Sequence, residues 1–186
     1  MLRRKFLLLK ILDWRKILLV LAITAFPVLV TLWRKSLNTT FFAITADDFH
    51  RTLYSWQVTQ GHFIPSDLWP PLQFLVDAFV LQFYPHVLAV PWLVNLSAST
   101  ATLICLIWLA RALDIKPVGR IFVVLLAATL PWFVWLSISG LAEPLYCLFI
   151  TLAYAGLVQW RKWSGDWALG VASLGLLAAG MLRFDG

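Results

Sequence analysis

The sequence predicts an all-α integral membrane protein with about five transmembrane helices and two juxtamembrane helices in the first extracytoplasmic loop. Hydrophobic residues make up 61% of the 186 residues and charged residues only 13%, and the mean hydropathy is +0.83. So little polar surface cannot cover a water-soluble globule. Apolar runs of membrane-spanning length recur along the chain, so no separate soluble domain is expected in residues 1–186.

The formal net charge of +6 raises the possibility of nucleic-acid binding. The basic residues, however, form short clusters at the ends of apolar runs and do not line one polar face, which is the pattern of membrane orientation. We therefore expect a lipid bilayer and no nucleic acid as a partner. Cys105 and Cys147 lie inside apolar runs and predict neither a disulfide framework nor a metal site.

The N-terminal region predicts a cytoplasmic start and a first membrane span. Residues 1–14 form a basic amphipathic stretch, and residues 17–33 form an apolar run just long enough to cross, with Pro27 as a kink. A cleaved signal peptide is the alternative, because small residues such as Ala22 and Ala25 follow a basic start. The apolar run continues beyond Ala25, which favours an uncleaved anchor.

The one long polar segment, residues 36–70, contains a helix start. Thr45-Ala46-Asp47-Asp48 has the pattern of a capping box in which Asp replaces the usual Glu or Gln. Gly61 is a natural helix stop. Between them the apolar residues fall on one stripe, which predicts a helix along the membrane surface; they are Phe49, Leu53 and Trp56.

Pro70-Pro71 breaks the chain before the apolar residues 72–84, which contain Asp77. A helix of this length covers roughly 20 Å, short of the ~30 Å hydrocarbon core. We therefore expect a second juxtamembrane or re-entrant helix.

Four further spans are predicted at residues 87–110, 121–139, 145–160 and 167–182. With the first span, this count keeps most Lys and Arg residues on the cytoplasmic side, as the positive-inside rule requires. The acids then gather in the outer loops. A functional site is therefore expected on the extracytoplasmic side of the membrane.

Asp47 and Asp48 are the first candidates for chemistry. In the first turn of a helix, free backbone N–H groups and the helix dipole favour an ionised carboxylate. Such a carboxylate can accept a proton or bind a divalent cation. Simple helix capping is the alternative role for this pair.

Glu143 is the second candidate, because it is wedged between two spans, where an isolated charge is costly unless water, a cation or a partner relieves it. A solvated turn residue is the alternative.

Arg51 and Arg183 are outer cations able to hold a phosphate through a planar fork, and His50 could assist as a donor. Interfacial snorkelling would explain the two arginines equally well.

The order of these motifs resembles the GT-C membrane glycosyltransferases, in particular the family 39 type that includes protein O-mannosyltransferases and aminoarabinose transferases. Four short motifs carry the resemblance: Thr45-Ala46-Asp47-Asp48-Phe49-His50-Arg51, Leu68-Trp69-Pro70-Pro71-Leu72, Ser139-Gly140-Leu141-Ala142-Glu143-Pro144-Leu145 and Leu182-Arg183-Phe184-Asp185-Gly186. Family members are much longer, so the chain resembles the N-terminal part of such an enzyme, truncated after Gly186.

The resemblance implies sugar transfer from a polyprenyl-phosphate-linked donor to an acceptor hydroxyl at the extracytoplasmic face. It gives Asp47 the role of general base, with Asp48 as neighbour or alternate. It gives Glu143 a part in donor, acceptor or metal binding, and Arg183 a contact to the donor phosphate. A divalent cation, Mg or Mn, would be held by Asp47 and Glu143.

Two other classes of function remain open. In a transporter or flippase fragment, an intramembrane acid such as Asp77 would mark an ion pathway. A noncatalytic assembly subunit would depend on helix packing and not on Asp47. The acids lie in outer loops and not at the midplane of several spans, which favours interfacial chemistry over transport.

Overall fold

The computed structural model describes residues 45–62 and 69–183, with single positions at 25, 26, 28, 29, 32, 33 and 36. These residues form seven α-helices and no strand, so the all-α prediction is confirmed for this part of the chain. The basic N-terminal stretch and the end of the chain at 184–186 lie outside the described residues. The first predicted span, 17–33, is described only at isolated positions.

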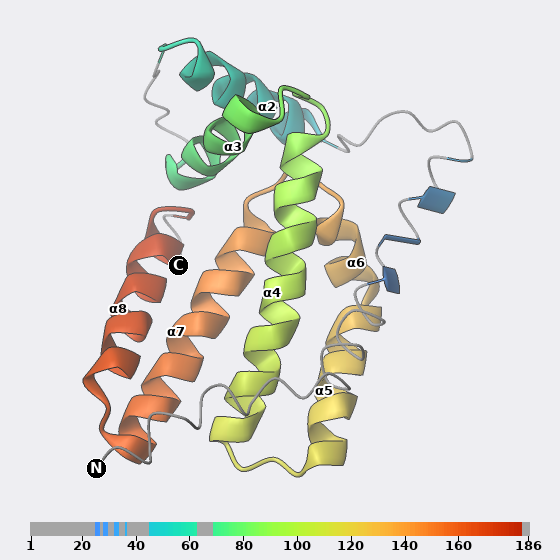
Figure 1. Ribbon diagram of the computed structural model, residues 1–186. Helices are drawn as coiled ribbons and strands as arrows, with labels where there is room; N and C mark the ends of the chain where they lie inside the picture. The colour runs from blue at the N-terminus through green and yellow to red at the C-terminus, as the bar shows by residue number, and fades with distance from the viewer. Residues whose placement is uncertain are drawn as a thin grey trace.

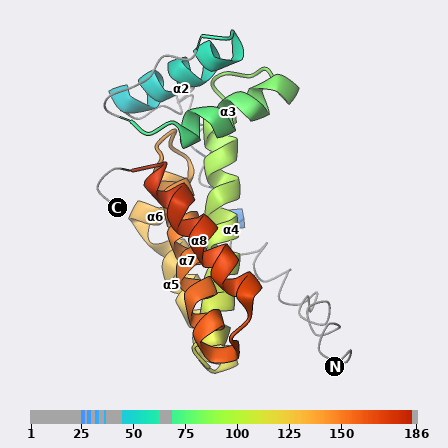
Figure 2. The same ribbon diagram turned by 90° about the vertical axis from the view of Figure 1, so that its left-hand side faces the viewer.

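Two short helices lie across one end of a helical bundle (Figures 1 and 2). The two helices are α2 (Ala46–Thr59) and α3 (Leu72–Phe83), and the bundle consists of α4 (Val90–Ala112), α5 (Pro117–Thr129), α6 (Pro131–Ser137), α7 (Glu143–Trp163) and α8 (Asp166–Gly180). The turns joining α4 to α5 and α7 to α8 lie at the opposite end of the bundle from α2 and α3.

The predicted start and stop of α2 are confirmed. The Thr45 side chain accepts a hydrogen bond from the Asp48 backbone N–H, and the Asp48 carboxylate accepts one from the Thr45 N–H, so both halves of the capping box form. After the helix, Gly61 has a φ of +79°, a conformation that costs glycine little.

Residues 121–139, which are predicted to form one span, do not form one continuous helix. The segment is divided at Leu130 into α5 and α6, which meet at a bend of 66°. Pro131 explains the break, because proline lacks a backbone N–H and disfavours the helical conformation of the residue before it. Leu130 accordingly has an extended backbone, with ψ at 123°.

One described helix, α4, is long and apolar enough to cross a membrane, and the bent pair α5 and α6 would add a second if it formed one span. The shorter helix α8 has 15 residues and so covers about 22 Å at ~1.5 Å per residue. The 21-residue helix α7 is long enough, but Glu143, Arg161 and Lys162 at its ends make it less apolar. The described part of the chain therefore does not establish five spans.

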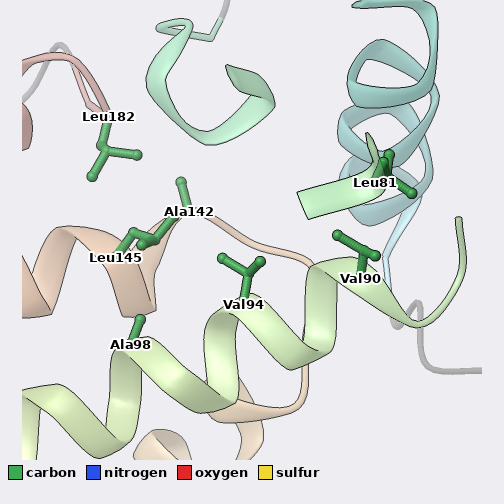
Figure 3. Packing of buried hydrophobic residues seen from close by; sticks show 7 residues of the cluster. All are labelled: Leu81, Val90, Val94, Ala98, Ala142, Leu145 and Leu182. Carbon is green, nitrogen blue, oxygen red and sulfur yellow. The ribbon is translucent and has the colours of Figure 1, made fainter. Parts of the chain in front are cut away.

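A hydrophobic cluster joins the bundle to α3 near the end where α2 and α3 lie (Figure 3). It draws side chains from α3, α4, the start of α7 and the residue that follows the α8 cap: Leu81, Val90, Val94, Ala98, Ala142, Leu145 and Leu182. Hydrophobic burial therefore fixes the positions of the segments that carry Glu143 and Arg183.

Candidate functional site

Helix α2 has its polar face turned inward. Its buried residues are Asp48, Arg51 and Ser55. The apolar stripe predicted from the sequence faces outward instead, with Phe49, Leu53 and Trp56 each more than two-fifths exposed. Because the buried face is polar, α2 presents its charged side chains to the end of the bundle.

Asp48 connects α2 to the loop between α6 and α7. Its side chain is 1% exposed. Oδ2 accepts the capping bond from the Thr45 N–H at 3.0 Å, and Oδ1 accepts a bond from the Gly140 N–H at 2.9 Å. Bonds from backbone N–H groups stabilise the ionised carboxylate, so Asp48 acts as a structural anchor in addition to its capping role.

The loop at residues 139–141 is held by side chains from two further helices. Gln73 of α3 donates from Nε2 to the Gly140 carbonyl at 2.6 Å. Asn95 of α4 donates from Nδ2 to the Ser139 carbonyl at 2.6 Å and to the Leu141 carbonyl at 2.7 Å. Since Gln73 and Asn95 are buried, these bonds fix the loop that leads directly into Glu143.

Glu143 begins α7 and pairs with Arg183, which follows α8. Arg183 Nη1 lies 3.2 Å from Glu143 Oε1, and both side chains are about one-third exposed. Arg183 also lies over the Tyr146 ring, 5.9 Å from its centroid. The second carboxylate oxygen, Oε2, is buried without a hydrogen-bond partner among the described residues. Glu143 therefore retains an acceptor for a further group.

Arg51 lies at the centre of these charges. Its Nη1 donates to Gln73 Oε1 at 2.8 Å, and its guanidinium lies 5.2 Å from the centroid of the Trp69 ring. Burial lowers the pKa of Arg51, while Glu143, Asp47 and Asp48 act to raise it and Arg183 acts to lower it further. The charged residues singled out from the sequence thus share one electrostatic environment.

Asp47 and His50 lie on the exposed part of α2. His50 donates from Nδ1 to the Ala46 carbonyl of its own helix at 2.9 Å, which leaves only Nε2 for another partner. The Asp47 carboxylate is solvent-accessible beside the buried Asp48. Of the two neighbouring acids, Asp47 is therefore the one that a substrate can reach.

Within residues 45–62 and 69–183, no group of three or more His, Cys, Asp or Glu side chains could hold a metal ion. Asp47 and Glu143 would supply two carboxylates at most. Mg²⁺ and Mn²⁺ accept such a set when phosphate oxygens and waters complete the coordination, and the unpartnered Glu143 Oε2 fits that chemistry.

Sequence reasoning did not identify Gln73 and Asn95 as parts of the site. Each is a polar residue inside an apolar run, and such residues are costly in an apolar environment unless they are bonded. That signal could have marked both. Their partners are backbone carbonyls 67 and 44 residues away, which no local pattern reveals.

No protein-family model, no curated protein and no solved structure matches this chain. The class of protein that the fold and the site define is therefore a helical bundle capped by two short helices, with a charged site at the capped end. Its function is inferred from the chemistry of these residues.

Proposed function

We propose that the chain is the N-terminal part of a membrane-embedded glycosyltransferase, which moves a sugar from a polyprenyl-phosphate donor to an acceptor hydroxyl at the extracytoplasmic face. One observation carries the proposal. Residues that are distant in the sequence, and on which the resemblance to such enzymes rests, lie close enough to Arg51 to act on its charge: Asp47, Asp48, Glu143 and Arg183.

The surface of the bundle supports embedding in lipid. Large apolar side chains on α4, α5 and α8 are more than half exposed, among them Ile104, Phe122, Leu126, Leu174 and Leu177. Only 39% of the apolar window of α4 is buried, whereas the core helix of a soluble protein is mostly buried. Lipid is the solvent that suits such a surface.

The charges support the proposed orientation. The helix ends and turns at the far end of the bundle carry the basic residues Arg111, Lys116, Arg120, Arg161 and Lys162. Lys162 there forms an ion pair with Asp114, which joins the α4–α5 turn to the end of α7. The positive-inside rule places this end in the cytoplasm, and α2 and α3 then lie on the outer face.

In the proposed reaction, the Asp47 carboxylate takes the proton of the acceptor hydroxyl. The acceptor oxygen attacks the anomeric carbon as the bond from that carbon to the phosphate oxygen breaks, so the configuration inverts and the lipid phosphate leaves. Arg183 stabilises the negative charge that develops on the phosphate, and Asp48 holds α2 so that Asp47 faces the substrate. A divalent cation bound by Asp47 and Glu143 would supply further positive charge to the phosphate.

Replacing Asp47 with Asn tests the base assignment. We expect transfer from a labelled polyprenyl-phosphate sugar, assayed in membranes with the full chain, to fall by roughly 10²–10⁴-fold, the usual contribution of a general base. Asp166→Asn is the matched control, because Asp166 is an exposed acid in the first turn of α8 at the other end of the bundle. Near-normal transfer by Asp47→Asn would refute the assignment and favour a noncatalytic subunit.

A further inference from the structure

Arg51 is a buried cation that forms no ion pair with any residue in the described part of the chain. It is 8% exposed, and among the described residues the one hydrogen bond of its guanidinium goes to the neutral amide of Gln73. Its Nε is buried without a hydrogen-bond partner among the described residues. Glu143, Asp47 and Asp48 act on Arg51 through space without forming an ion pair with it.

A buried cation normally pairs with an anion, because desolvation is costly. The planar fork of an arginine is suited to the oxygens of a phosphate diester, and stacking on an aromatic ring holds that fork in place. Gln73 and Trp69 constrain Arg51 in this way. Arg51 therefore has the chemistry of an anion-binding residue.

Asp77 lies on the α3 face that α2 covers, one helical turn from Gln73. It is fully buried, and neither carboxyl oxygen has a hydrogen-bond partner among the described residues. The Ser55 hydroxyl donates to the Arg51 carbonyl. Burial raises the pKa of Asp77 to about 8, against smaller opposing effects of Ser55 and of the Arg51 guanidinium.

The charged groups around Asp77 leave Arg51 as its one counter-ion. Helix α3 carries no other charged residue, and the single charge of α4, Arg111, lies at the far end of that helix. The titratable groups on α2 are Asp47, Asp48, His50, Arg51 and Tyr54, and Glu143 and Arg183 lie on adjoining segments. Of these, Arg51 alone acts on the Asp77 pKa.

We propose that Arg51 binds the phosphate diester of the lipid-linked substrate and that Asp77 competes with this anion for the same guanidinium. While the Asp77 carboxyl is neutral, Arg51 is available to the diester. Once Asp77 loses its proton, the buried carboxylate requires a partner, and the unpartnered Arg51 Nε–H can supply it. Protons thereby promote anion binding. The identity of the anion rests on the proposed function, but the competition itself does not.

Anion binding to the full chain in detergent tests the proposal without any sugar transfer. The probes are sulfate and a dialkyl phosphodiester, whose charges do not change in the range used. The anion affinity of the wild type is expected to fall about tenfold between about pH 7 and about pH 9. Asp77 loses its proton near pH 8, and Arg51 is then no longer available to the anion. Asp77→Asn should remove this pH dependence, Arg51→Gln should abolish binding, and Asp166→Asn should behave as wild type.

Thermal unfolding supplies a second readout. Folded Asp77 keeps its proton up to about pH 8, whereas an unfolded aspartate releases it near its ordinary value of 3.8. The folded state therefore binds more protons between these values, and stability should decline as the pH rises through this window. Asp77→Asn should flatten the decline.

The outcomes separate the sources of the anion. Tighter binding of the phosphodiester than of sulfate supports a lipid headgroup, and equal affinity supports a small free anion at the same site. Binding of either probe that does not change with pH in the wild type, or that survives in Arg51→Gln, overturns the proposal. The wild-type titration decides the question even if Asp77→Asn does not fold. If the chain does not transfer sugars, the expected pH dependence of anion binding stays the same.

Discussion

Asp48→Ala is expected to lower the free energy of unfolding by about 2–4 kcal/mol. The substitution removes one half of the α2 capping box, the hydrogen bond from the Thr45 N–H to the Asp48 carboxylate, at a cost of about 1 kcal/mol. It also leaves the Gly140 N–H without its side-chain acceptor in a buried site, at a further cost of about 1–3 kcal/mol. Because proteins are stable by only ~5–15 kcal/mol, this loss is a large share of the total.

The measurement is unfolding in a mild detergent, followed by circular dichroism. Asp166→Ala is the matched control, since Asp166 occupies the first turn of α8, where the cap residue makes no side-chain hydrogen bond. The control should change stability by less than about 0.5–1 kcal/mol. Similar effects of the two substitutions would show that Asp48 acts only through the dipole of its helix and not through Gly140.

Of the two contacts of the Asp48 carboxylate, the sequence predicts only one. Its capping role follows from four consecutive residues, and that prediction is confirmed. Its bond to Gly140 spans 92 positions and depends on the packing of α2 against the bundle. Local pattern therefore predicts the start of the helix, but the link between α2 and the loop at residues 139–141 comes from tertiary structure.

The orientation of α2 could not be predicted from the sequence. The spacing of Phe49, Leu53 and Trp56 predicts one apolar stripe, but periodicity does not tell whether that stripe faces protein or lipid. The structure turns the stripe outward and buries Arg51. The spacing therefore predicts the stripe but not the side to which it turns.

The break between α5 and α6 also could not be predicted from the sequence. Mean apolarity over residues 121–139 favours a single span, and Pro131 can be accommodated as a kink in many membrane helices. Here the preceding Leu130 leaves the helical conformation entirely. The short helix α6 that results returns the chain to residues 139–141, where Asn95 and Gln73 hold it.

Gly156→Ala and Gly175→Ala are each expected to destabilise the contact between α7 and α8 by about 1–3 kcal/mol, the usual range for overpacking. A Cβ at Gly156 would lie 2.7 Å from the Ala168 carbonyl oxygen, and one at Gly175 would lie 2.8 Å from the Phe149 carbonyl oxygen. Backbone atoms cannot rotate away as a flexible side chain can, so the helices must separate.

Gly170→Ala on the same helix α8 is the control, because a Cβ there would meet nothing within 4 Å. Alanine in that position should stabilise the helix by about 0.5–1 kcal/mol, since glycine loses more conformational freedom on folding. Opposite signs at Gly175 and Gly170 in the same unfolding assay would confirm close packing of α7 on α8. Because α8 leads directly to Arg183, separation of the two helices should also weaken its ion pair with Glu143. Equal stabilisation by all three substitutions would show that the helices do not approach so closely.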